Sequence, residues 1–245
     1  MGATARGDNV AMSEESNAAN PEPPTASRAE LLPGVRAQLL ATEHWSLLAS
    51  RSTTQGEVLT RISMFLTFTS ASLLSVALVG NATQFSDAFR AFALTILCID
   101  LVVGLLTHIR VMSVAMEDLM YVIAMNRLRA AYVDLDPGIA PYLMAGSADD
   151  EEGAKRTYYF LGGRRDFNQV AGSSMVFMGV VNAALIALLT GSALLTAGLP
   201  AVAAVPVAVL AALGFFGTSL VRGHHRYLDV WRNNPPISPT PPHPG

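Results

Sequence analysis

Charged residues are scarce in this chain, and one long stretch has none. Asp, Glu, Lys and Arg make up 14% of its 245 residues, whereas about 25% is usual for a soluble domain. None of the four occurs in residues 167–221. A helix needs about 20 apolar residues to cross the hydrocarbon core of a bilayer, so this stretch is long enough for two spans, with a turn expected at residues 198–200. The sequence therefore predicts a membrane protein.

Cysteine and catalytic motifs are also scarce. Cys98 is the only cysteine, which excludes an internal disulfide framework, and we expect it to be a small buried apolar residue. The sequence contains no phosphate-binding glycine loop, zinc-binding HExxH motif or nucleophile elbow. We therefore expect no enzyme activity, no cofactor and no metal site. The net charge of -3 without a basic stripe argues against a nucleic-acid partner.

Hydropathy predicts an all-α fold, namely a four-helix transmembrane bundle with cytoplasmic helical extensions. The expected regions are a disordered tail (1–33), a cytoplasmic amphipathic helix (35–60), four spans (62–80, 91–109, 174–196 and 201–220), a cytoplasmic helical linker between spans two and three (111–170), and a proline-rich tail (233–245).

Two details of the polar regions follow from local sequence. Ser52, Thr53 and Thr54 interrupt the amphipathic pattern, and Thr54 with Glu57 has the form of a capping box that restarts the helix. The acidic run at residues 149–152 lacks the ligand spacing and the glycine of a calcium loop, so we expect a solvated loop there.

Basic residues predict the orientation, because Lys and Arg in the flanks of spans stay on the cytoplasmic side. Arg90 is the only basic residue in the two loops of the opposite side. We therefore expect a multi-pass protein of the plasma membrane with both termini in the cytoplasm. The basic residues on the cytoplasmic side are Arg36, Arg51, Arg61, Arg110, Arg127, Arg129, Lys155, Arg156, Arg164, Arg165, Arg222, Arg226 and Arg232.

A carboxyl group is expected near the middle of span two, at Asp100. A charge at the bilayer centre costs about 2.5–3.5 kcal/mol on insertion scales and needs a partner. Counted from the cytoplasmic end of each span, Asp100, Asn182 and Thr69 lie at one depth. We expect an intramembrane polar layer in which Asn182, Thr69 and Ser70 hydrogen-bond to a protonated or ion-bound Asp100. Three interpretations stay open: a proton or cation relay, a structural bond between helices, and a lipid-facing or water-filled position.

Small residues recur at four-residue spacing along span three, and small faces let transmembrane helices approach closely. The stripe predicts helix packing, either within the hairpin of spans three and four or between copies of a homo-oligomer. Its members are Gly179, Ala183, Ala187 and Gly191.

Two strings of residues resemble a known family. LATEHWSLLASRS at residues 40–52 and MNRLRAAY at residues 125–132 are similar to stretches of an uncharacterised family of actinobacterial four-span integral membrane proteins. The resemblance implies a bacterial plasma membrane and no particular activity. Since both strings lie on the cytoplasmic side, we expect a contact surface for an unidentified cytoplasmic protein there, at Glu43, His44, Trp45, Asn126, Arg127 and Arg129.

The leading expectation for function is a non-catalytic membrane scaffold or sensor whose cytoplasmic helices contact a partner. The alternative is a homo-oligomeric pore or a small transporter linked to cations or protons, which Asp100 and the hydroxyl-rich first span favour. The expected partners are thus the lipid bilayer, a cytoplasmic protein and a second copy of the chain.

Overall fold

The computed structural model describes residues 33–159 and 173–241 and confirms the expected all-α class. The described residues are 86% helical and include no strand. Four of the helices are long and apolar enough to cross a membrane. The protein therefore has the construction of a helical membrane protein.

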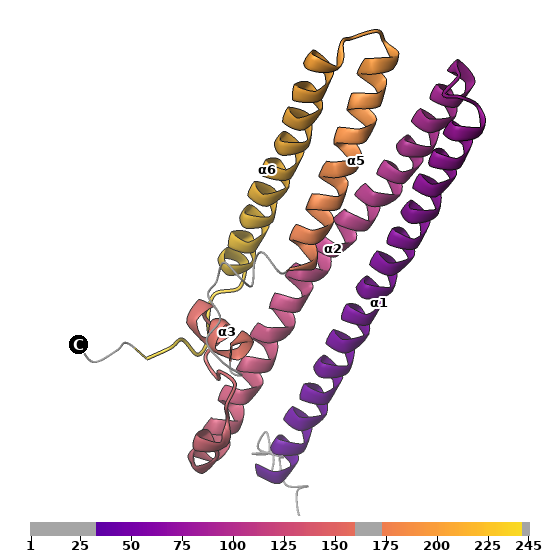
Figure 1. Cartoon of the computed structure of the whole chain (residues 1–245). Helices are drawn as coiled ribbons and strands as arrows, with labels where there is room; N and C mark the ends of the chain where they lie inside the picture. The colour runs from indigo at the N-terminus through magenta and orange to yellow at the C-terminus, as the bar shows by residue number, and fades with distance from the viewer. Residues whose placement is uncertain (1–32, 160–172, 242–245) are drawn as a thin grey trace, which may run out of the picture.

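Two antiparallel hairpins make up the fold (Figure 1). Helices α1 (Pro33–Ala82) and α2 (Asp87–Leu135) form the first, and α5 (Ser174–Thr196) and α6 (Ala201–Asn233) form the second. Helix α2 packs against both α1 and α5, and α6 packs mainly against α5. Figure 1 shows both hairpin turns at one end of the molecule, which we call the turn end; we call the opposite end the polar end.

The turn end is built from two short connections. In the first, Gln84 and Phe85 adopt φ values of 51° and 55°, and the Ser86 side chain caps α2 by accepting a hydrogen bond from the Phe89 amide. In the second, Gly198 adopts a φ of 88°, which glycine reaches without a steric cost. The charge-free stretch therefore folds back where its turn residues are expected.

Helix α1 is one continuous helix of 50 residues, so the expected interruption at residues 52–54 is wrong. The Thr53 hydroxyl donates to the carbonyl oxygen of Ala49 within the same helix (3.0 Å), and this bond lets a threonine remain in a helix. Helix α2 is likewise unbroken over 49 residues. At about 1.5 Å per residue, both helices continue far past the expected spans toward the polar end.

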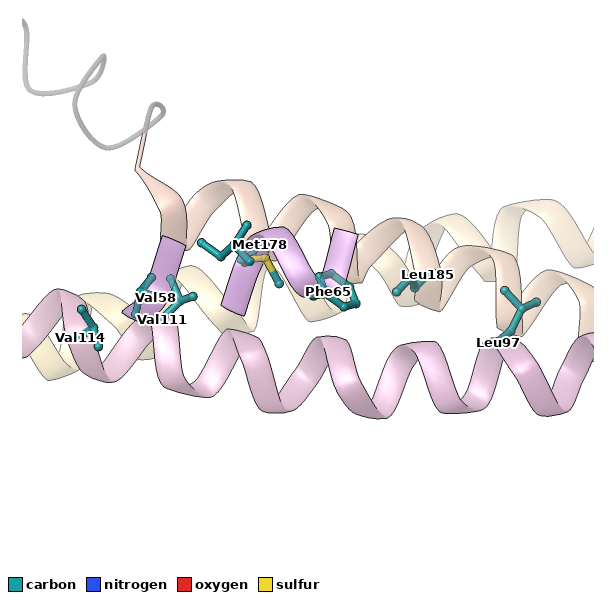
Figure 2. Close-up of a cluster of buried hydrophobic side chains, with 8 residues drawn as sticks. Val58, Phe65, Leu97, Val111, Val114, Met178 and Leu185 are labelled. Carbon is teal, nitrogen blue, oxygen red and sulfur yellow. The ribbon is translucent and has the colours of Figure 1, made fainter. Parts of the chain in front are cut away.

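An apolar core follows the contact of α1, α2 and α5 (Figure 2). Only one stripe of α2 faces these neighbours, so Leu97 is buried while the adjacent Cys98 is exposed. The expectation of a buried cysteine is therefore wrong. The buried members of this core are Val58, Ile62, Phe65, Leu97, Val111, Val114, Met178 and Leu185.

A second core lies at the polar end, where η1 (Pro137–Tyr142) and α3 (Glu151–Tyr158) pack against α2. It also draws side chains from α1 and α6, including Leu47 and Trp231. These segments, together with residues 234–241, form one packed unit that we call the polar module. Its buried apolar members are Leu119, Val122, Ile123, Met125 and Ala154.

Candidate functional site

Asp100 lies on the buried stripe of α2 and is 0% exposed. Neither of its carboxylate oxygens has a hydrogen-bond partner among the described residues. The Ser72 hydroxyl of α1 faces the carboxyl group but does not reach hydrogen-bond geometry. A charged carboxylate in apolar surroundings is far more costly than the neutral acid, so this arrangement favours the protonated form of Asp100.

Asn182 of α5 does not bond to Asp100, contrary to our expectation. Its amide nitrogen donates to the carbonyl oxygens of Gly104 (3.1 Å) and Met178 (2.8 Å), while its amide oxygen has no partner among the described groups. Gly104 permits this contact, because a Cβ atom there would collide with the Asn182 oxygen. Asn182 therefore fastens α5 to the backbone of α2 one turn away from Asp100.

The two hydroxyl residues expected in the layer point in different directions. Thr69 is buried and its hydroxyl lacks a partner in the part of the chain that is described. Ser70 is exposed and donates to the Leu66 carbonyl oxygen (2.7 Å). Successive helix residues are about 100° apart, so Thr69 and Ser70 do not both face α2. Ser72, which the sequence interpretation missed, follows Thr69 at the three-residue spacing of one helix face and takes the place of Ser70.

His108 is a second buried polar residue that the sequence interpretation missed. It lies two turns from Asp100 on α2, and its Nε2 atom hydrogen-bonds to the Ser219 hydroxyl of α6 (2.5 Å). Its ring also packs against Phe215. Gly179 of α5 lies next to the ring, since a Cβ atom there would be in ordinary contact with it at 3.8 Å. His108 therefore joins α2 to α6 across α5.

Two cavities flank the buried layer. The first, of about 380 Å³, extends between the hairpins from Arg90 near the turn end to Leu97, and α5 contributes Ser192 to its wall. We call it the turn-end groove. The second, of about 260 Å³, is lined by Val111 and Asp118 and lies toward the polar end. The apolar core drawn in Figure 2 contributes to the walls of both cavities, Leu97 to the first and Val111 to the second.

Asp118 of α2 is the main polar contact between helices in the polar module. Its carboxylate accepts two hydrogen bonds from Arg51 of α1, at 2.7 Å and 3.2 Å. It also accepts from the Gln55 amide (2.7 Å) and the Tyr158 hydroxyl of α3 (2.8 Å). Burial, followed by the negative charge of Asp118, raises the pKa of Tyr158, so the phenol stays a donor. One carboxylate thus ties three helices together.

The MNRLRAAY string contributes internal contacts rather than a free surface. Asn126 is 0% exposed; its nitrogen donates to the Ala148 carbonyl oxygen (2.7 Å), and its oxygen accepts from Thr157 and Arg129. Arg127 pairs with Asp149 at 2.6 Å. Three of the six residues expected on a contact surface are therefore used inside the module, which corrects that expectation for Asn126, Arg127 and Arg129.

The acidic run is not the solvated loop that we expected. Asp149 is 0% exposed and accepts hydrogen bonds from the backbone amides of Ile237 (2.9 Å) and Ser238 (2.8 Å). Burial alone would raise the pKa of Asp149, but these amides and Arg127 together hold it below its usual value. Asp150 caps α3 and also binds Thr240. The proline-rich segment after α6 is thus fastened to the polar module.

The strings at residues 40–52 and 125–132 meet in space. The His44 ring stacks on Tyr132, with centroids 6.0 Å apart. Burial and, to a lesser extent, the charge of Arg129 lower the pKa of His44, so the imidazole is neutral at pH 7. Glu43 is exposed, and Trp45 is 71% exposed. Of the expected contact surface, only Glu43 and Trp45 are therefore well placed to meet a partner.

The small-residue stripe of α5 faces α6. A Cβ atom on Gly179 would lie 3.3 Å from the Phe216 ring, and one on Gly191 would lie 3.6 Å from the Ala208 Cβ atom. Ala183 and Ala187, between them, are half-buried. The stripe is thus used for packing within the second hairpin.

No group of three or more His, Cys, Asp or Glu side chains within the described ranges is placed to hold a metal ion. Fold and site together define an all-helical membrane protein with a buried carboxyl group between its helices and a packed polar module at one end. Comparisons of the chain with family models, with curated proteins and with solved structures found no match.

Proposed function

We propose that the protein is a non-catalytic membrane scaffold or sensor whose polar module lies in the cytoplasm. The orientation is supported by the basic side chains, which gather at the polar end, since such residues remain on the cytoplasmic side. The resemblance of residues 40–52 and 125–132 to the actinobacterial family supports a bacterial plasma membrane. Membership of that family is part of the proposal.

The observation that carries this proposal is the continuity of α1 and α2. Each helix runs without a break from the apolar segment into the polar module, and Asp118 joins both helices to α3. A module so connected has a fixed position relative to the membrane. A shift between the two helices within the bilayer would also reach the module, as a sensor requires.

The proposed contact with a cytoplasmic protein is centred on Trp45. A tryptophan that is 71% exposed lies outside the expected spans, and tryptophan is enriched among the residues that dominate protein interfaces. Glu43 is also exposed, but it lies two residues from Trp45 and therefore points to a different side of α1. Trp45 is the most exposed large apolar residue of the two strings, since Leu48 is 41% exposed.

Photo-crosslinking in native membranes tests this function. A photoreactive residue at position 45 should capture a defined protein, and Trp45→Ala should abolish its co-purification with the full chain. Tyr142→Ala is the matched control, because Tyr142 is an exposed aromatic residue (83%) on η1. The scaffold proposal fails if neither a partner nor self-association depends on Trp45.

A homo-oligomeric pore or a transporter linked to cations or protons is the second candidate. It is favoured by the carboxyl oxygens of Asp100, which have no hydrogen-bond partner in the described part of the chain, and by the cavities on either side of that residue. Purified protein in vesicles should then carry an Asp100-dependent flux, and native mass spectrometry should detect oligomers. Vesicles with no flux under a proton, sodium or potassium gradient would eliminate this candidate.

A further inference from the structure

Asp100 has no role in the scaffold as described, yet it is costly to keep. It is completely buried, and both of its carboxylate oxygens lack partners among the described residues. An apolar side chain would pack in this position without that cost. An ionisable residue inside a membrane is the default candidate for a functional site, and such residues usually pair with another group. The groups around Asp100 therefore decide which binding partner it can have.

No charged group among the described residues neutralises Asp100. Helix α1 presents Thr69 and Ser72, α5 presents the uncharged Asn182, and no charge acts on the carboxyl group from any neighbouring helix. On α2 itself Cys98 lies two residues away on the exposed side of the helix, His108 lies two turns away and is bonded to α6, and Arg90 pairs with Asp87 (3.1 Å). A proton is thus the smallest partner that neutralises the carboxylate.

The route to Asp100 is short from the turn end. Helix side chains lean toward the N-terminus of their helix, and the N-terminus of α2 is at the turn end. The turn-end groove reaches Leu97, which lies three residues or about 4.5 Å along the axis from Asp100. The cavity of the polar end stops at Val111, eleven residues or about 16 Å away, with Phe65 and Met178 packed between.

We propose that Asp100 is a proton-binding site loaded from the outer face of the membrane through the turn-end groove, and that it is the input of the sensor. A hydronium ion delivers its proton to the carboxylate and leaves as water. The orientation and the sensor output rest on the proposed function, whereas proton binding through the groove does not.

The position of Asp100 between α1 and α2 explains how a change in its charge would alter the polar module. Loss of the proton places a negative charge between α2 and the Ser72 face of α1, where only hydroxyl groups can solvate it. Water must then enter between the helices. Because both helices are unbroken, this separation is carried to the Arg51–Asp118 contact.

Carbodiimide modification tests the site, because this apolar reagent reacts with protonated carboxyl groups. The full chain is reconstituted in one orientation in vesicles, the pH on each side is varied separately, and modified Asp100 is measured by mass spectrometry. We expect the amount of modified Asp100 to depend on the pH on the side of the turn end and not on the pH on the other side. Asp100→Asn should give no product at this position.

Two tryptophan variants give a matched control for the route. Ser192→Trp fills the turn-end groove and should abolish the dependence on outer pH, whereas Ala115→Trp fills the other cavity and should leave it unchanged. Circular dichroism and size exclusion check folding, and Leu188→Trp replaces Ser192→Trp if that variant misfolds. The proposal is overturned if the amount of modified Asp100 depends on the inner pH, or if it depends on neither pH. Protection by sodium at constant pH also overturns it, in favour of a cation site.

A distance measurement separates this proposal from the proposed function. Spin labels at the exposed positions Glu43 and Asp134, in a Cys98→Ala background, report the spacing of α1 and α2 at the polar end. The spacing should change with outer pH in the parent and stay constant in Asp100→Asn. An unchanged spacing in the parent refutes Asp100 as the sensor input. Loss of partner capture with intact carbodiimide behaviour refutes the scaffold but leaves the proton site.

Discussion

Replacing Asp118 by alanine should loosen the polar module, because one carboxylate binds three helices there. The substitution removes the acceptor of Arg51 and Gln55 on α1 and of Tyr158 on α3. Each of these donors then has to find water or remain unsatisfied. The size of the effect depends on how much water already reaches the contact.

The structure places this contact between a surface and a buried ion pair. The Arg51 and Asp118 side chains are 24% and 16% exposed. Breaking a buried pair costs about 3–5 kcal/mol, an exposed pair contributes about 0–1 kcal/mol, and a hydroxyl left without its acceptor costs about 1–3 kcal/mol. We expect the free energy of opening the module to fall by about 2–3 kcal/mol, which raises the equilibrium constant for opening about 30- to 150-fold.

Amide hydrogen exchange measures this opening in α3 and in the polar-end part of α1 separately. Asp118→Ala should speed exchange in both segments, and Asp118→Asn should have a smaller effect because the amide oxygen still accepts. Asp229→Ala is the control, since its pair with Arg232 (3.4 Å) is largely exposed. If Asp118→Ala changes exchange in α3 no more than Asp229→Ala does, the carboxylate does not hold the module together.

Three further outcomes follow from single contacts. The pKa of Asp149 is lowered, so its stabilising bonds are complete above about pH 4, the range of an unfolded Asp, and are lost as the pH falls through the lower folded pKa. Proteolysis of residues 235–241 should therefore accelerate only in strong acid. Asp149→Asn should accelerate it at pH 7. Gly104→Ala should lower the thermal stability in detergent by about 1–3 kcal/mol through overpacking, whereas Gly217→Ala, with open space around it, should not. Arg129→Gln should raise the pKa of His44, measured by NMR titration, because a nearby positive charge is removed; an unchanged value would leave burial as its only cause.

The helices of the apolar part could be predicted because their signal is local. A charge-free stretch with one turn signal leaves few alternatives, and α5 (Ser174–Thr196) covers the residues expected for the third span. The continuity of α1 could not be predicted in the same way. Ser52, Thr53 and Thr54 are weak helix formers, but packing of α1 on α2 along its length overrides that preference.

The sequence predicts helices outside the membrane, but it does not predict the contacts of the polar module, because the residues in contact are distant along the chain. An acidic run normally indicates solvent, yet Asp149 is buried by amides that lie 88 and 89 residues further on. Asn126 and Arg127 likewise read as surface residues until α3 and the C-terminal segment are placed beside them. No local pattern predicts which polar residues of a helix will be covered by a later segment.

The buried layer shows that a sequence predicts the depth of a residue in the membrane but not the neighbouring helix that its side chain faces. The rise per residue is constant in a helix, so counting from the span ends placed Asp100, Thr69 and Asn182 near one depth. Rotation about the axis is equally regular within one helix, but the direction of its neighbours is set by how the helices pack. Asn182 therefore bonds to the backbone at Gly104 instead of to Asp100, and Ser72 replaces Ser70. It is this rotation that leaves the Asp100 carboxyl group without a bonded partner among the described residues.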